Sequence, residues 1–202
     1  MAISAPHVYQ QATFILSAKA LSQLPADIGA EIAFAGYSNV GKSSILNVLT
    51  QQQKLARTSK MPGCTQQINV FALDPGRRLI DLPGYGYAKV AQQTKQAWQQ
   101  LLDSYLQTRN SLKGIILVMD IRHPLKPVDQ LMLKWAAMSH IPICLLLNKV
   151  DKLNKSKARA TFYQVQQATK AYKNLISVQF FSALRKQGIV ECHHFLEQHL
   201  KS

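Results

Sequence analysis

The sequence has few of the features that mark secreted, membrane-spanning or zinc-binding proteins. Its 202 residues include only three cysteines, Cys64, Cys144 and Cys192, and no two of them form a C-x-x-C pair. This spacing fits free thiols in a reducing compartment better than a disulfide framework or a zinc site. No apolar run reaches the ~18 residues of a membrane span, and polar residues interrupt the N-terminal stretch. We therefore expect a cytoplasmic protein without a transmembrane segment.

Carboxylates are also scarce. The chain has 10 Asp and Glu against 24 Lys and Arg, which gives a net charge of +14. Such an excess attracts phosphate backbones or anionic lipid, although single lysines can simply keep helix surfaces soluble. The balance favours a nucleic-acid partner. The stretch from 152 to 190 has no carboxylate and holds Lys152, Lys155, Lys157, Arg159, Lys170, Lys173, Arg185 and Lys186.

Length and patterning predict one α/β domain. Short apolar runs rich in branched residues occupy 31–35, 115–119 and 143–147, as expected for strands covered on both faces. Helical patterns separate them, so the order predicts right-handed crossovers and a mostly parallel sheet with helices on both faces. The expected helices span about 42–50, 91–109, 127–138, 156–172 and 188–200, and a last strand spans 175–181. Residues 1–28 are expected to extend a core formed by 29–202, with a further strand near 12–17.

One part of the chain interrupts this alternation. Residues 67–73 and 77–81 flank Asp74-Pro75-Gly76, a strong turn signal. These two segments are therefore expected to form an antiparallel hairpin, which makes the sheet mixed and reverses one strand at its edge.

The segment Gly36-Tyr37-Ser38-Asn39-Val40-Gly41-Lys42-Ser43 matches the phosphate-loop pattern. It follows an apolar strand and precedes a helix, as the mechanism requires. Glycines let backbone amides and the helix N-terminus approach phosphates closely. Lys42 is expected to reach the β and γ phosphates, and the Ser43 hydroxyl to bind Mg²⁺.

Two later segments complete a nucleotide site. Asp81-Leu82-Pro83-Gly84 ends the second hairpin strand, where Asp81 can hold Mg²⁺ through water and the Gly84 amide can meet the γ-phosphate. Asn148-Lys149-Val150-Asp151 follows a buried strand, and the Asp151 carboxylate can accept two hydrogen bonds from guanine but none from adenine. Asn148 is expected to brace this loop, and the stem of Lys149 to lie on the base. The amides of Ser182-Ala183 are weaker candidates for the guanine oxygen.

With these residues assembled, the chain resembles the EngB family of translation-factor-related GTPases over nearly its full length. The segments that carry the resemblance are GYSNVGKSS at 36–44, TSKMPGCTQ at 58–66, DLPGYGYAKV at 81–90, NKVD at 148–151 and FSAL at 181–184. The resemblance implies a P-loop G domain that binds GTP and GDP, hydrolyses GTP with Mg²⁺, and acts in assembly of the large (50S) ribosomal subunit through ribosomal RNA. The family is also associated with cell division and septation. A monomer is expected.

The resemblance assigns further site residues. It makes Thr65, rather than Thr58, the switch residue that completes the Mg²⁺ shell, so Lys42, Thr65 and Gly84 are the expected catalytic residues. Tyr37 and Cys64 replace arginines common in the family, and Asn148 stands where threonine is frequent. A redox role for Cys64 is the less favoured interpretation. The remaining expected nucleotide contacts are Ser44, Gly63, Cys64, Gln66, Gln67, Leu82, Pro83, Val150 and Phe181.

Slow hydrolysis is expected because Tyr85 stands where many switch GTPases place a water-orienting glutamine. Relatives with asparagine at the position of Asn39 can bind K⁺, which would supply positive charge instead. Two rival functions are an ATP-dependent P-loop enzyme, which gives Asp151 no purpose, and a GTP-regulated scaffold at a membrane or division site. No lipidation motif or cationic amphipathic anchor supports the latter.

Overall fold

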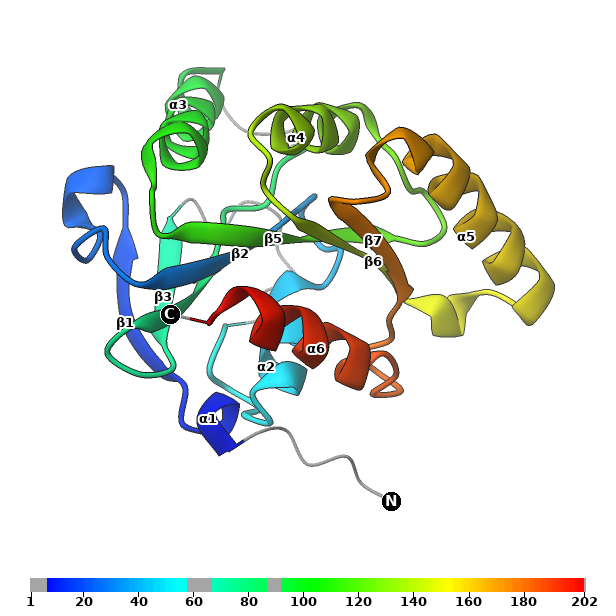
Figure 1. The fold of residues 1–202 in the computed structure, drawn as a ribbon, viewed down its shortest axis with the longest axis horizontal. Helices are drawn as coiled ribbons and strands as arrows, with labels where there is room; N and C mark the ends of the chain where they lie inside the picture. The colour runs from blue at the N-terminus through cyan, green and yellow to red at the C-terminus, as the bar shows by residue number, and fades with distance from the viewer. Residues whose placement is uncertain (1–6, 58–66, 87–91, 202) are drawn as a thin grey trace.

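The computed structural model describes residues 7–57, 67–86 and 92–201. It has three layers, in which α3 (Gln92–Thr108) and α4 (Pro127–Met138) cover one face of a central sheet (Figure 1). The opposite face carries α2 (Lys42–Leu49) and α6 (Ile189–His199), with the short α1 (His7–Gln10) beside them. Helix α5 (Lys155–Ala168) packs beside the last strand. This is the expected α/β architecture.

The sheet has seven strands in the order β1-β3-β4-β2-β5-β6-β7. Strands β4, β2, β5, β6 and β7 run parallel, and β3 runs antiparallel to both of its neighbours. The strands are β1 (Thr13–Ala18), β2 (Ala30–Gly36), β3 (Ile68–Ala72), β4 (Arg77–Asp81), β5 (Leu112–Asp120), β6 (Ile143–Asn148) and β7 (Ile176–Phe180).

The expected hairpin is present as β3 and β4, joined by a turn in which Asp74 Oδ1 accepts the N–H groups of Gly76 and Arg77 at 2.9 Å each. The early strand near 12–17 is also present, as β1. Because β1 pairs outside β3, the reversed strand lies one position in from the edge rather than at it. The sequence pattern of an isolated strand does not show which neighbour it will pair with.

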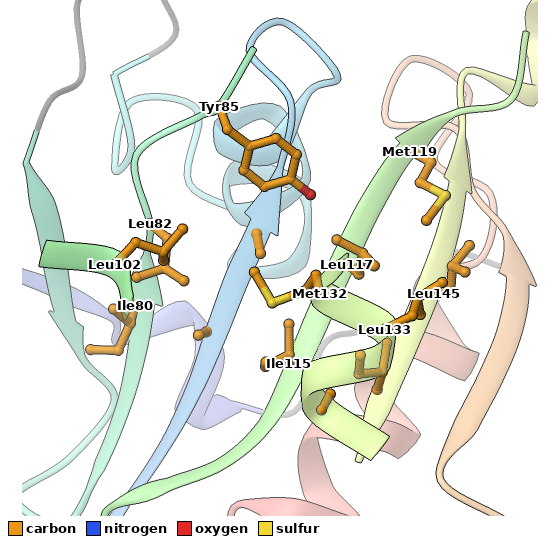
Figure 2. Packing of buried hydrophobic residues seen from close by; sticks show 14 of the residues in the cluster. Ile80, Leu82, Tyr85, Leu102, Ile115, Leu117, Met119, Met132, Leu133 and Leu145 are labelled. Atoms are coloured by element: carbon orange, nitrogen blue, oxygen red, sulfur yellow. The ribbon is translucent and has the colours of Figure 1, made fainter. Parts of the chain in front are cut away.

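Alternate residues of the central strands supply two separate cores. In β5, Ile115 and Leu117 face the α3–α4 layer, whereas Ile116 and Val118 face the α2–α6 layer. This period of two, with both faces apolar, explains why the strand reads as an unbroken hydrophobic run. Figure 2 shows Leu117 and Leu145 of the sheet meeting Met132 and Leu133 of α4 in the first of these cores.

The helix boundaries follow local chemistry. Helix α5 ends at Ala168, before the expected position 172, and Thr169 caps it by donating its hydroxyl to the Val165 carbonyl at 3.0 Å. A separate 3-10 turn, η3 (Lys170–Tyr172), follows. The other 3-10 turns are η1 (Leu21–Gln23) and η2 (Val150–Lys152).

Three further expectations concern membranes, thiols and metals. Within 7–57, 67–86 and 92–201, no helix is both long and apolar enough to cross a bilayer. Cys144 and Cys192 are buried free thiols, whereas Cys64 lies outside the described residues. No group of three metal-ligating side chains occurs in the part of the chain that is described.

Candidate functional site

The loops that follow β2, β4, β6 and β7 lie at one edge of the sheet. Parallel strands bring their carboxyl ends to the same edge, which is where α/β folds bind ligands. A β-bridge between Tyr37 and Tyr85 joins the first two loops. The Val150 N–H donates to the Phe181 carbonyl at 3.2 Å and joins the last two. The fold therefore gathers segments that are far apart in sequence.

The phosphate loop, residues 36–44, connects the end of β2 to the first turn of α2. Its backbone conformation requires glycine at two positions. Gly36 and Gly41 have φ values of 146° and 106°. A Cβ atom would lie 2.3 Å from the Val118 carbonyl oxygen at Gly36, and 2.5 Å from Asn148 Nδ2 at Gly41. The N-cap residue of α2 is Gly41, which has no side chain to cap the amide groups of the first turn. These amide groups are therefore available to an anion.

Lys42, the first residue of α2, is buried under this loop. Its ammonium donates to the carbonyl oxygens of Gly36, at 3.2 Å, and Tyr37, at 3.5 Å. Burial lowers the pKa of Lys42, and the nearby Asp81 carboxylate raises it. The ammonium is thus held in a fixed position at the end of β2, where phosphate would meet it.

Asp81 ends β4 beside Ser43, and its environment favours a cation. The Ser43 hydroxyl donates to Asp81 Oδ2 at 3.3 Å, and Asp81 Oδ1 is buried with no hydrogen-bond partner among the described residues. Burial raises the pKa of Asp81, while the Lys42 ammonium acts in the opposite direction. A bound divalent cation would satisfy this carboxylate, so these side chains fit Mg²⁺.

The residues after Asp81 pack directly on the phosphate loop. A Cβ atom at Gly84 would lie 2.9 Å from Lys42 Nζ and 3.0 Å from the Ser38 Cα atom, so any larger residue would require Lys42 or the phosphate loop to shift. The Ser38 N–H donates to the Tyr85 carbonyl at 2.9 Å. Leu82 and Pro83 are buried. Movement of this segment would therefore disturb the phosphate loop directly.

Asn148 and Lys149 brace the phosphate loop from the side of β6. The Asn148 amide donates from Nδ2 to the Val40 carbonyl at 2.7 Å and accepts the Ala183 N–H at 3.4 Å. Lys149, in the left-handed region with φ of 65°, donates from Nζ to the Asn39 carbonyl at 2.7 Å. Asn148 and Lys149 therefore tie the loop after β6 to the phosphate loop.

Asp151 is held by a residue of the next loop. Its Oδ1 atom accepts the Ser182 hydroxyl at 2.5 Å, and Oδ2 lies 3.9 Å from Lys152 Nζ. The Asp151 side chain is 10% exposed. By contrast, the Phe181 side chain is fully buried in the core, and its N–H donates to the Leu147 carbonyl at 3.0 Å. Phe181 therefore anchors the loop instead of facing the site.

The remaining expected contacts lie around this centre. Asn39 is exposed, with φ of 61°, and Ser44 and Gln67 are half-buried. The expected residues of the first switch segment, Gly63, Cys64, Thr65 and Gln66, lie outside the described residues.

Sequence reasoning missed two polar residues that position this site, Asp120 and Asp129, and the role of the Ser182 side chain, since only the Ser182 amide was expected to take part. Asp120, at the end of β5, pairs with Lys149 at 3.0 Å. The Ser182 side chain holds Asp151, and Asp129 of α4 accepts the Tyr85 hydroxyl at 2.6 Å. A signal existed for Asp120 alone, because it is a carboxylate at the carboxyl end of a central strand.

Comparison with known proteins places these features in a family. A family model described as "50S ribosome-binding GTPase" matches residues 31–149. Two curated relatives come from Shigella boydii serotype 4 (strain Sb227) and Escherichia coli O139:H28 (strain E24377A / ETEC), and both are named "Probable GTP-binding protein EngB". Each is 51% identical over 181 residues, which covers 90% of this chain and 86% of the relative. The chain belongs to the EngB family of P-loop GTPases.

Membership of the EngB family makes the chain a GTPase that binds GTP and GDP with a divalent metal, generally Mg²⁺. Two solved structures are similar in fold. A probable GTP-binding protein EngB has a TM-score of 0.68 at 20% identity and covers 85% of this chain and 98% of its own. Era in complex with MgGDPNP and nucleotides 1506–1542 of 16S ribosomal RNA has a TM-score of 0.67 at 20% identity, with coverages of 87% and 58%.

Proposed function

We propose that this EngB-family chain is one G domain over residues 1–202 and works in the cytoplasm as a slow GTP switch in assembly of the 50S ribosomal subunit. The placement of Asp151 is the observation that best supports the assignment of GTP as the nucleotide. Its carboxylate is held by Ser182 on one oxygen, beside a loop that Asn148 ties to the phosphate loop.

Guanine recognition is assigned to this carboxylate. Guanine offers a ring N–H and an exocyclic amine to one carboxylate, whereas adenine offers a bare nitrogen at the matching position. A carboxylate that must be paired rejects adenine strongly, by factors that can reach about ten-thousand-fold. The stem of Lys149 is assigned to the face of the base. The Ser182 N–H is donated to the Gln187 carbonyl at 3.1 Å, so the guanine oxygen is assigned to the Ala183 amide, whose bond to Asn148 is long at 3.4 Å.

Phosphate and metal binding are assigned to the other side of the site. Lys42 would neutralise the β and γ phosphates, and Ser43 and Asp81 would hold Mg²⁺, Asp81 through water. Thr65 completes the Mg²⁺ shell in the GTP state, and the Gly84 amide meets the γ-phosphate. These roles are supported by the buried pair of Lys42 and Asp81 and by the fit of Gly84 against Ser38.

Slow turnover follows from the position of Tyr85. Its side chain is 1% exposed and its hydroxyl is bonded to Asp129, so it is held among α4 residues and is not free to orient water. We assign to K⁺ the positive charge that would assist hydrolysis. Asn39 would help to bind this ion, because its exposed position and left-handed backbone leave its side chain accessible. Equal hydrolysis rates in K⁺ and Na⁺ would remove this part of the proposal.

The ribosomal partner is supported by charge. The eight basic residues between 152 and 190 are all exposed, and no carboxylate occurs within that stretch. A surface of this kind binds phosphate backbones with strong salt dependence. Effects on septation would then follow from a defect in ribosome assembly. The second candidate function, a scaffold on an anionic membrane, is supported only by the same positive charge.

The decisive experiment changes Asp151 to Asn. An amide donates to the C2 carbonyl of xanthine but cannot accept both guanine donors, so affinity should move from GTP to XTP. Loss of GTP binding without gain of XTP binding would contradict the assigned contact. Sedimentation with 50S particles and with anionic liposomes, each across a salt series, shows whether the partner is the ribosomal particle or the membrane.

A further inference from the structure

A groove runs between strand β1 and the segment that follows α2, on the side of the sheet that carries α2. Its polar section encloses about 450 Å³ and adjoins a more open section of about 580 Å³, and Phe14, Lys54 and Leu55 line both. The polar section is lined by Phe14, Ser17, Lys54, Leu55, Arg57, Gln67, Asn69 and Phe71. Among the residues that the structure describes, no carboxylate lines either section.

A bulge in β1 builds the floor of this groove. Phe14 pairs with Phe71 and Ser17 pairs with Asn69, and the register shifts between Phe14 and Leu16. Residues three apart in a regular strand point to opposite faces, but one extra residue brings Phe14 and Ser17 to the same face. The groove therefore presents an aromatic ring and a hydroxyl on one surface.

The aromatic part of the floor is open to solvent. Phe14 is 52% exposed, and its ring packs edge-on against the buried Phe71, with centroids 5.8 Å apart. Phe71 thus supports the Phe14 ring from below and leaves a face of it available. An exposed aromatic ring that is fixed by a buried neighbour offers a stacking surface at little entropic cost.

Hydrogen bonds fix the opposite wall. Asn47 donates from Nδ2 to the carbonyls of Gln53, at 3.2 Å, and Ala56, at 2.9 Å, and accepts the Ala56 N–H at 2.8 Å. Gln52 donates to the Ala12 carbonyl at 2.7 Å, which ties this segment to the start of β1. The exposed cations Lys54 and Arg57 therefore project from a backbone that is already ordered.

We propose that this groove binds a single-stranded segment of RNA, with one base stacked on Phe14 and the backbone phosphates neutralised by Lys54 and Arg57. The inference deepens the proposed ribosomal role and rests on it. A stacking ring beside cations, without carboxylates, is the combination that single-stranded nucleic acid requires. Duplex RNA offers no unstacked base to the ring and is the weaker ligand.

The groove also touches the nucleotide site through one side chain. Ser17 donates its hydroxyl to Asn69 Oδ1 at 2.6 Å, and Asn69 lies opposite Asp81 in the β3–β4 ladder. RNA in the groove would therefore contact a residue next to the metal-binding carboxylate.

The test measures binding of the full chain to a fluorescent single-stranded oligoribonucleotide and to a duplex of the same length. Phe14→Ala should weaken single-strand binding about tenfold, and Phe14→Tyr should retain it. Lys54→Gln with Arg57→Gln should weaken binding and reduce the salt slope by about 1.4, the value for two phosphates on a single strand. Lys113→Gln with Lys134→Gln removes the same charge from exposed sites elsewhere and should change little.

Unchanged single-strand affinity in both groove variants would overturn the proposal, as would equal affinity of the wild-type chain for duplex. Sedimentation with 50S particles distinguishes a failure of the groove proposal from a failure of the proposed ribosomal role. If groove variants still bind 50S particles and single strands normally, the groove proposal is wrong while the ribosomal role stands. If variants lose 50S binding with intact single-strand affinity, the groove holds a protein, which also overturns it. If the wild type does not bind 50S particles, the ribosomal role itself fails.

Discussion

Lys149 and Asp120 form an ion pair of 3.0 Å between the ends of β6 and β5, and the same Lys149 ammonium donates to the Asn39 carbonyl. Asp120 is 10% exposed and is also bound by the Arg122 guanidinium, at 2.7 Å. Burial raises the pKa of Asp120, but the hydrogen bonds from Arg122 and Lys149 hold it below its usual range. Asp120 therefore stays ionised and positions the lysine that braces the phosphate loop.

Asp120→Asn should speed release of GDP about tenfold, which corresponds to about 1.4 kcal/mol. The substitution keeps the shape but removes the charge that holds Lys149. Stopped-flow release of a fluorescent GDP measures the rate. Arg122→Gln, which removes the exposed partner, serves as the control and should have a smaller effect. In a Lys149→Met background, Asp120→Asn should add almost nothing, and an additive effect would contradict the positioning role.

The Asp129 carboxyl links stability to pH. Burial raises its pKa to about 6, although hydrogen bonds from Tyr85 and the Lys126 amide favour the ionised form. Because the folded pKa lies above the unfolded one, the native state binds the proton more tightly. This contribution to stability is complete below about pH 4 and is lost as pH rises through about 6.

Asp129→Asn mimics the neutral acid and should remove that dependence. The free energy of unfolding of the wild type, relative to Asp129→Asn, should fall by up to about 3 kcal/mol between pH 4 and pH 7.5. Urea unfolding at a series of pH values measures the difference. Parallel curves for the two proteins would show that this carboxyl does not titrate in the expected range.

Glu31 supports a buried ionic network at the opposite end of β2. Its side chain is fully buried and accepts Arg78 Nε at 2.8 Å, Arg109 Nη2 at 2.7 Å and the Tyr105 hydroxyl at 3.0 Å. Glu31→Gln leaves Arg78 without its anion and Arg109 with only the more distant Asp27 carboxylate, at 3.6 Å, so it should cost about 3–5 kcal/mol of unfolding free energy. Asp74→Asn breaks a more exposed pair with Arg77 and should cost less than about 1 kcal/mol. Similar losses in urea unfolding would contradict the importance of burial.

Local patterns were enough to predict the longer helices α2 to α6, the central strands and the hairpin, but not the short α1. Strand β5, for example, is buried on both faces, and its apolar run is visible without any partner. The phosphate loop and the Asn148–Asp151 loop were also predictable, because each is a contiguous motif after a strand. Figure 1 shows the central strands with helices on both faces, which is the arrangement that the alternation of strand and helix patterns predicts.

Contacts between distant segments could not be predicted in the same way. The bond between Tyr85 and Asp129 joins residues 44 positions apart, and that between Ser182 and Asp151 spans 31. The bulge that brings Phe14 and Ser17 to one face depends on the register of β1 against β3. Strand register and helix docking are set by the whole fold, so the sequence alone does not indicate the role of a single residue such as Asp129.

Gly84→Ala tests the contact between the end of β4 and the phosphate loop. The added methyl group would lie 2.9 Å from Lys42 Nζ and 3.0 Å from the Ser38 Cα atom, so the loop or the 81–85 segment must shift. The proposed mechanism requires Lys42 and the Gly84 amide to be in place together, so we expect the rate of GTP hydrolysis under single-turnover conditions to fall more than about tenfold. Gly76→Ala is the matched control, since its methyl group would meet only Asp74 Oδ1, at 3.8 Å, and it should hydrolyse GTP normally. A normal rate in both variants would mean that the 81–85 segment leaves the phosphate loop before hydrolysis, and that Gly84 is required by the resting conformation alone.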